Sequence, residues 1–220
     1  MARPYEAAIF DLDGTLLDTE QIYSVASNAF LARYGARFEV SLKRRTMGRD
    51  NREGAAIVIE ALGLELGVDA YLEGRDREFR RLLPQVEALP GAEIMVARAR
   101  AAGLGVAIAT SSHATLARAK IETQAFLTEI DVVICGDDPR LARGKPDPAI
   151  FELAAASLGV DPGRCVAFED SANGVQAALA AGMDVVGIRD PRWALPRSVY
   201  AGAQVVVDDL SDLDPARLGW

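Results

Sequence analysis

The sequence predicts an α/β protein, with a doubly wound, Rossmann-like parallel sheet as its core and an inserted all-helical domain. Three observations support this fold class. Short apolar runs alternate with helical patterns after residue 88, as they do in chains of βαβ units. Residues 18–88 contain helical patterns only. Half of the 220 residues are hydrophobic, which is enough for a sizeable core.

The first predicted strand, residues 7–10, leads directly into a pair of carboxylates. Its apolar residues have the character of a buried strand, and Asp11 and Asp13 follow before Gly14 turns the chain away. Alternate residues of an extended segment point to the same side, so both carboxylates are expected to face one small volume. Like charges this close are destabilising unless a cation or a shared proton relieves them. The pair therefore predicts a metal site.

Residues 18–88 are predicted to form a helical cap domain, which leaves residues 1–17 and 89–220 as the α/β catalytic core. Asp18-Thr19 can cap the first helix of this domain. Apolar residues at helical spacing then predict helices over 22–30, 51–62 and 69–83.

The cap also contains a basic segment, Lys43-Arg44-Arg45 with Arg49 and Arg52. A charge run is most often a solvated face, and that is our interpretation of this one. The functional alternative is that Arg49, beside Gly48, faces the cleft and binds the substrate.

The remainder of the core is predicted from apolar runs that alternate with helices. Strands are expected over 104–109, 131–135, 165–168, 184–188 and 204–207. Helices are expected over 92–102, 114–124, from 148 onward, and 174–181. Ser112 is the expected cap of the second of these helices, and Asp147 caps the third with Pro148 at its first position.

Composition excludes several classes of partner. The net charge of −8 makes the chain a poor partner for nucleic acid, whose binding depends on Lys and Arg. No apolar run is long enough to span a bilayer.

Cys135 and Cys165 lie in apolar runs and are expected to be buried free thiols. The chain runs from Met1-Ala-Arg-Pro4 into the first strand without a signal peptide, so we expect a cytoplasmic protein, with a monomer as the default.

Polar clusters follow the predicted strands. Asp11-x-Asp13 follows the first strand, Thr110-Ser111-Ser112 the second, and Glu169-Asp170-Ser171 the strand at 165–168, while Lys145 begins the helix near 148. Ligands of open α/β sheets bind at the carboxyl ends of the strands, so these loops are expected at one rim.

Together these residue types match a phosphoryl-transfer site. Asp11 is the expected nucleophile, and Asp13 the group that protonates the leaving oxygen and then activates water. Mg²⁺ prefers oxygen ligands, which Asp11, Asp13, Asp170 and Glu169 can supply. Lys145 adds a fixed charge and Thr110 holds phosphoryl oxygens. Further contacts to the phosphate or substrate are expected from Gly14, Ser111, Ser112, Ser171 and Arg49.

Structural alternatives remain open for several of these residues. Ser171 can cap the following helix instead of binding phosphate. Lys145 alone reads as a surface lysine, and only its place in the set changes that interpretation. His113 is interpreted as a surface residue without a catalytic role.

The set Asp11-Leu-Asp13-Gly-Thr15, Thr110, Lys145 and Glu169-Asp170 resembles, in order, the four motifs of the haloacid dehalogenase superfamily. The position of the insert resembles the subgroup with a helical cap between the first two motifs. The segments Gly144-Lys-Pro-Asp-Pro148 and Phe168–Val175 are similar to those of pseudouridine 5′-phosphatase-like and glycerol-phosphatase-like enzymes. The resemblance implies a Mg²⁺-dependent phosphatase that acts on a small phosphorylated metabolite, such as a sugar, nucleoside or polyol phosphate.

Three other functions are alternatives to this one. A β-phosphoglucomutase-like hexose-phosphate mutase is the alternative within the superfamily, but such mutases carry a histidine just after the first motif, where residues 19–23 have none. A receiver-type signalling module has about half this length and no cap. A catalytically idle binding protein does not account for the complete set of motifs.

Overall fold

The computed structural model describes residues 5–46, 51–193 and 195–220. The chain divides into two compact units. Met1–Asp18 and Glu87–Trp220 form the core unit, and Thr19–Val86 form the helical unit. Arg49, one of the predicted substrate contacts, lies outside the described residues.

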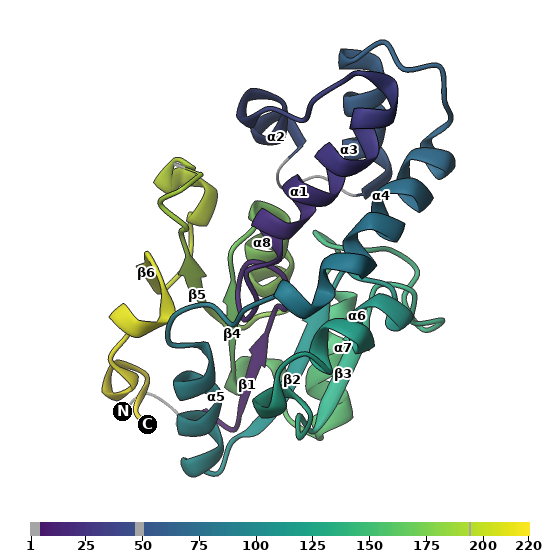
Figure 1. Ribbon diagram of the computed structural model, residues 1–220. Helices are drawn as coiled ribbons and strands as arrows, with labels where there is room; N and C mark the ends of the chain where they lie inside the picture. Colours follow the sequence, from purple (N-terminus) through teal and green to yellow (C-terminus); the bar gives the residue numbers. More distant parts are fainter. Residues whose placement is uncertain (1–4, 47–50, 194) are drawn as a thin grey trace. The chain divides into compact units, whose positions relative to one another are not determined.

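The core unit contains one six-stranded sheet, in the order β3-β2-β1-β4-β5-β6 (Figure 1). All five strand pairs are parallel, which confirms the predicted fold class. The strands are β1 Ala7–Phe10, β2 Gly105–Thr110, β3 Val132–Cys135, β4 Cys165–Glu169, β5 Asp184–Ile188 and β6 Val205–Val207. β1 lies between β2 and β4 and is buried along its whole length, because both of its faces are covered.

The helices of the core unit are α5 Ala92–Ala101, α6 Ala114–Ile121, α7 Ala149–Leu158 and α8 Ala172–Ala180. One face of the sheet, which includes Ile9 and Ala167, shares a buried apolar cluster with residues of α7 and α8. Neighbouring strand residues point to the opposite face, where the rings of Phe10 and Phe168 stack with centroids 4.4 Å apart. Apolar contacts on both faces therefore hold the first strand, and the carboxylate that follows it, in place.

The helical unit consists of α1 Thr19–Leu31, α2 Val40–Thr46, α3 Asn51–Ala61 and α4 Val68–Leu82. Its core gathers buried residues of all four helices, among them Phe30, Leu42, Val58 and Tyr71. Gly74 of α4 lies so close to Phe30 that a Cβ there would fall 2.0 Å from the ring. Close packing of α1 on α4 thus depends on this glycine.

The prediction of a solvated basic face is wrong for Lys43. Its side chain is buried in α2, a helix that the sequence did not predict. Its Nζ donates to the Glu20 carbonyl at 2.5 Å and to Ser24 Oγ at 2.9 Å. Arg44 and Arg45 are exposed, as expected.

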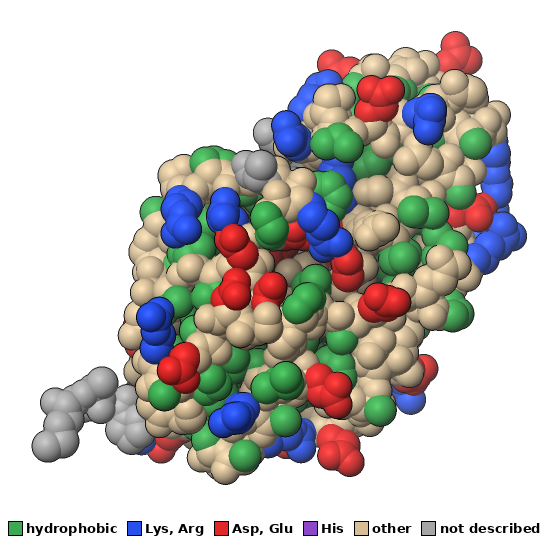
Figure 2. Space-filling model, turned by 60° about the vertical axis from the view of Figure 1, so that its left-hand side comes forward, with side chains coloured by type: hydrophobic (Ala, Val, Ile, Leu, Met, Phe, Trp, Pro, Cys, Tyr) green, Lys and Arg blue, Asp and Glu red, His purple; other side chains and the backbone are tan. Residues whose placement is uncertain are grey.

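Seven 3₁₀ turns complete the secondary structure of the described residues: Ala32–Tyr34, Leu83–Gln85, Ala125–Leu127, Pro162–Arg164, Arg197–Tyr200, Leu210–Asp212 and Pro215–Leu218. Within the described ranges, no helix is long and apolar enough to cross a membrane. Figure 2 shows acidic and basic side chains interspersed over the face that it presents.

Candidate active site

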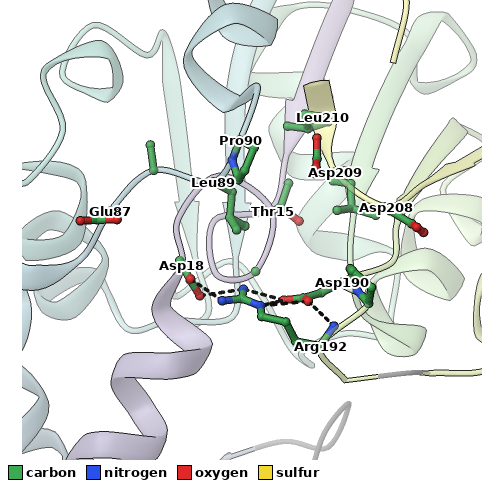
Figure 3. Close-up of a pocket in the computed structure, with 14 residues that line it drawn as sticks. Thr15, Asp18, Glu87, Leu89, Pro90, Asp190, Arg192, Asp208, Asp209 and Leu210 are labelled. Carbon is green, nitrogen blue, oxygen red and sulfur yellow. Dashed lines mark hydrogen bonds and ion pairs between the residues drawn. The ribbon is translucent and has the colours of Figure 1, made fainter. Parts of the chain in front are cut away.

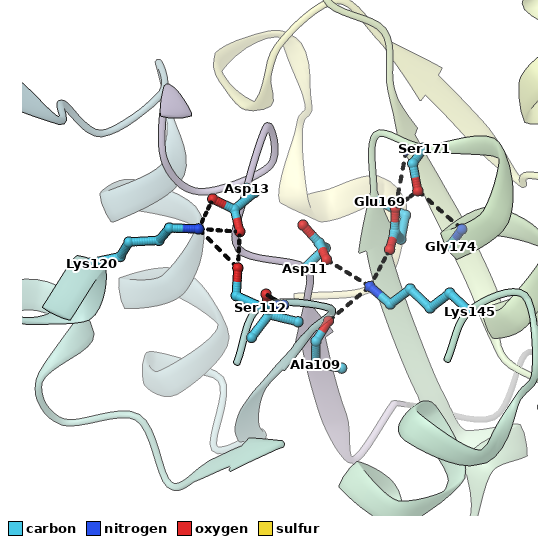
Figure 4. A network of polar contacts seen from close by, with 10 residues as sticks. Asp11, Asp13, Ala109, Ser112, Lys120, Lys145, Glu169, Ser171 and Gly174 are labelled. Atoms are coloured by element: carbon cyan, nitrogen blue, oxygen red, sulfur yellow. Dashed lines mark hydrogen bonds and ion pairs between the residues drawn. The ribbon is translucent and has the colours of Figure 1, made fainter. Parts of the chain in front are cut away.

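The carboxylate of Asp11 lies at the carboxyl end of the central strand, where one lysine holds it. Lys145 Nζ donates to Asp11 Oδ1 at 2.6 Å, to Glu169 Oε1 at 2.5 Å and to the Ala109 carbonyl at 2.8 Å (Figure 4). The Asp11 backbone N–H donates to the Phe168 carbonyl at 2.9 Å. Asp11 is only 7% exposed. One buried ammonium group therefore joins the ends of β1, β2 and β4.

The second carboxylate oxygen of Asp11 is differently placed. Oδ2 is turned away from Lys145 (Figure 4), and no hydrogen bond from the described part of the chain reaches it. Burial raises the pKa of Asp11 to about 7; Lys145 opposes the increase, and Glu169 and Asp13 add to it. Burial alone would lower the pKa of Lys145, but its two carboxylate partners hold that pKa above its ordinary value.

Asp13 belongs to a separate network on the α6 side of the site. Ser112 Oγ donates to Asp13 Oδ2 at 2.8 Å. Lys120 Nζ donates to Asp13 Oδ1 at 2.6 Å, to Oδ2 at 2.8 Å and to Ser112 Oγ at 2.8 Å (Figure 4). Lys120 is not among the residues predicted from the sequence to belong to the site. Lys120 falls on the buried stripe of α6 with Leu116 and Ala117, a pattern that can indicate burial but not the partner.

The three hydroxyl residues at the end of β2, Thr110-Ser111-Ser112, differ in their burial and contacts. Thr110 is buried, and its Oγ1 accepts a hydrogen bond from the Ser112 backbone N–H at 3.1 Å. Ser111 is exposed. The prediction that Ser112 caps α6 is wrong, because the Ala114 N–H donates to Asp137 Oδ1 at 2.8 Å while the Ser112 hydroxyl is used by Asp13. His113 is exposed, as expected.

Glu169 is fully buried at the end of β4, and its two oxygens have separate partners. Oε1 accepts from Lys145, and Oε2 accepts from Ser171 Oγ at 3.0 Å. Ser171 Oγ in turn accepts from the Gly174 N–H at 3.0 Å and caps α8. These contacts favour the capping alternative for Ser171. They also tie Glu169 to Lys145.

The carboxylate of Asp170 lies beside the loop that carries Asp11 and Asp13. Gly14 has a φ of +84°, and a Cβ at this position would fall 2.3 Å from Asp170 Oδ2. No three Asp, Glu, His or Cys side chains are grouped to hold a metal by themselves in the described ranges. Mg²⁺ commonly takes one or two carboxylates and completes its octahedron with water and substrate phosphate. Asp11 and the carboxylate beside Gly14, Asp170, supply two carboxylates at this loop, and their oxygen chemistry fits this cation.

A cavity of about 360 Å³ lies next to this network in the core unit. Its lining comes from the segment after β1, from residues 87–90, and from the end of β5 with the segments that follow β5 and β6. Arg192 lines it, and its Nη1 donates to Asp18 Oδ2 at 2.6 Å (Figure 3). The buried Thr15 Oγ1 has no hydrogen-bond partner among the residues described.

Comparison with known proteins identifies the family. The model of the haloacid dehalogenase-like hydrolases matches residues 5–182. The chain belongs to this family. The match covers the Asp11–Gly14 loop, Thr110, Lys145 and Glu169-Asp170, so the predicted family and the predicted enzyme class, a hydrolase, are confirmed.

Relatives within the family are named as phosphatases. The chain is 36% identical over 217 residues to (DL)-glycerol-3-phosphatase 2 of Arabidopsis thaliana, covering 96% of this chain and 90% of that one. It is 34% identical over 215 residues to a Drosophila melanogaster protein named "Probable pseudouridine-5'-phosphatase", with 96% and 92% covered. The crystal structure of CbbY from Rhodobacter sphaeroides in complex with phosphate has a TM-score of 0.83 at 28% identity, with 98% of this chain and 100% of that chain covered.

Proposed function

We propose that this hydrolase is a Mg²⁺-dependent phosphatase of a small phosphomonoester, a sugar, nucleoside or polyol phosphate, and that it forms an aspartyl phosphate on Asp11. The observation that carries the proposal is the asymmetry of the Asp11 carboxylate. Lys145 holds Oδ1, while Oδ2 has no partner in the described chain. A nucleophile needs this arrangement, because it must be fixed in orientation yet keep one oxygen for the reacting phosphorus. The two named relatives add support.

The reaction divides into two displacements at phosphorus. In the first, Asp11 Oδ2 forms a bond to phosphorus as the ester P–O bond breaks, and Asp13 gives a proton to the leaving alkoxide oxygen. In the second, Asp13 takes a proton from water as that water attacks the aspartyl phosphate. The acyl phosphate P–O bond then breaks, which returns the Asp11 carboxylate and releases inorganic phosphate.

Mg²⁺ would be held by the carboxylates of Asp11 and Asp170 and the backbone carbonyl of Asp13. When bound, it would offset the repulsion between the anionic nucleophile and the anionic phosphate. The contacts of Glu169 lead us to assign this residue to holding Lys145 instead of the metal. Thr110 and Ser111 stay in the proposal as phosphate contacts at the end of β2.

The helical unit is proposed to act as a cap over the core. Its chain leaves the core unit after Asp18 and returns at Glu87. Both connections therefore lie near the Asp11–Gly14 loop. Asp18 follows this loop in the chain, and an isolated bridge joins Leu17 to Ala88 where the chain returns. A domain inserted at this point can exclude bulk water and select the alcohol part of the substrate.

The experiment is a phosphate-release screen on a panel of phosphorylated sugars, polyols and nucleosides. We expect Mg²⁺-dependent release by the wild-type protein, and loss of release in Asp11→Asn and in excess EDTA. Glucose 1-phosphate is included because a mutase would convert it to glucose 6-phosphate without releasing phosphate. Equal release by the wild type and Asp11→Asn would contradict the proposal.

A further inference from the structure

We infer that Lys120 is a positioning residue for Asp13, which sets the place of the proton donor at the leaving oxygen. This inference rests on the proposed function. Lys120 lies 107 positions after Asp13 in the chain, and only the fold brings the two residues together.

The contacts of Lys120 are those of a group that orients its partner. Its ammonium group donates to both oxygens of the Asp13 carboxylate, at 2.6 and 2.8 Å. Contacts from one nitrogen to both oxygens fix the distance and direction of the carboxylate, and a second donor is needed to fix its rotation about that line. Ser112 Oγ adds a third contact at 2.8 Å and is itself 2.8 Å from Lys120 Nζ. Lysine, serine and aspartate thus form a closed triangle.

The burial of Lys120 makes this triangle rigid. The side chain has no exposed surface. Burying an ammonium group is costly unless a charged partner and hydrogen bonds compensate for lost hydration. Asp13 is the carboxylate that compensates here, and its own side chain is 20% exposed. Lys120 therefore cannot leave Asp13 without a large cost, and it restricts the directions in which Asp13 can turn.

The site consequently has one lysine for each of the two carboxylates of the Asp11-x-Asp13 pair. Lys145 serves Asp11 and Glu169, and Lys120 serves Asp13. The two lysines belong to different elements: Lys145 lies in the loop before α7, and Lys120 lies in helix α6. Asp11 and Asp13 can thus be held separately although they are two residues apart. Misplacing a proton donor by about 1 Å can cost on the order of 100-fold in rate.

The test is the leaving-group dependence of Lys120→Met. Methionine has a similar length and no charge, so Asp13 loses its orienting contact while the packing volume is kept. With the best alkyl phosphate of the screen, we expect kcat to fall about 10- to 100-fold and KM to stay within about twofold. With p-nitrophenyl phosphate, whose leaving group needs no proton, we expect a loss of at most about threefold in the phosphorylation step. Rapid-quench measurement of aspartyl phosphate formation isolates that step.

Two further variants separate positioning from stability. Lys43→Met removes another buried lysine, one that belongs to the helical unit. This variant is expected to leave the ratio of the rates with the two substrates unchanged. In an Asp13→Asn background, Lys120→Met should cause no further loss, because the donor that it positions is already gone. If Lys120→Met does not fold, Ser112→Ala tests the same triangle and should show the same substrate bias in smaller degree.

Equal losses in the rate of the phosphorylation step with both substrates would overturn the role of Lys120. An additional loss of that rate in the Asp13→Asn background would do the same. So would an unbiased Ser112→Ala. These outcomes differ from failure of the proposed function, in which the wild-type protein itself releases no phosphate from any phosphomonoester of the panel.

Discussion

Gly174 and Glu169 are in such close contact that a Cβ on Gly174 would fall 1.8 Å from Glu169 Oε1. Gly174 belongs to the first turn of α8, and Glu169 Oε1 is the oxygen that accepts from Lys145. The absence of a side chain at position 174 is therefore a condition for the contact that holds Lys145 beside Asp11.

Gly174→Ala is expected to displace the Glu169 carboxylate and loosen Lys145. We predict a fall in kcat of about tenfold or more, together with a loss of about 1–3 kcal/mol in the free energy of unfolding, as for other overpacked sites. Gly54→Ala in α3 is the matched control, because its Cβ would meet nothing closer than 3.6 Å. This control should stabilise its helix by up to about 1 kcal/mol. Wild-type kinetics in Gly174→Ala would contradict the prediction.

Asp11 gives a prediction for pH. Its pKa is raised from 3.8 to about 7, so the folded state holds this proton at pH values where the unfolded state has lost it. The contribution of Asp11 to stability is therefore fully present below about pH 4 and is lost as the pH rises through about 7. Relative to Asp11→Asn, the metal-free wild type should become less stable across this range.

Urea unfolding of both proteins in EDTA, at pH values from about 4.5 to 8, measures the difference. Each unit of pKa shift corresponds to about 1.4 kcal/mol, so the difference should change by a few kcal/mol. A difference that is flat with pH, or that changes in favour of the wild type, would show that burial does not dominate the ionisation of Asp11.

Asp170 gives a prediction for the metal. Asp170→Asn removes one of the two carboxylates assigned to Mg²⁺, and we expect the concentration of Mg²⁺ for half-maximal activity to rise about tenfold or more. Asp208→Asn is the control: Asp208 lies after β6 and pairs with Arg189 at 2.6 Å. Titration of phosphate release with Mg²⁺ should separate the two variants, and an equal Mg²⁺ requirement would remove Asp170 from the metal site.

Gly14 combines a positive φ with a close neighbour, and the two effects can be separated. Gly14→Ala adds backbone strain and a collision with Asp170, so both stability and the affinity for Mg²⁺ should fall. Gly103→Ala has nearly the same φ, +77°, and no atom within 4 Å of its Cβ. It should lose about 1 kcal/mol of stability and keep full activity. Normal Mg²⁺ dependence in Gly14→Ala would refute the close approach of the Asp170 carboxylate to Gly14.

The strands were predictable because a parallel sheet covered on both faces consists of apolar runs. Residues 184–188 illustrate this, since β5 has the predicted bounds. Helix α2 was not predicted because only Leu42 and Lys43 of its seven residues are buried, which gives no apolar periodicity. Short helices held by tertiary contacts have too little sequence pattern of their own.

The motif carboxylates and Lys145 were predictable as a set because the carboxyl ends of parallel strands meet at one rim. Lys120 was not, since a lysine in a helix is ordinarily exposed and its partner Asp13 is brought near only by the fold. The capping role expected of Ser112 failed for a related reason. A distant carboxylate competed for the hydroxyl, and Asp137 was available to the helix end.

The central place of β1 also has a consequence for synthesis of the chain. Ala7 pairs with Gly105 on one side and with Cys165 on the other. β1 is therefore made before both of its partners, which follow about one hundred and more residues later, after the helical unit between them is already complete. Asp11, the proposed nucleophile, is thus translated before Lys145 and Glu169 and acquires its surroundings only once they have been made. A nascent chain stopped before β4 would carry Asp11 without Glu169, and acquisition of activity would report the end of folding.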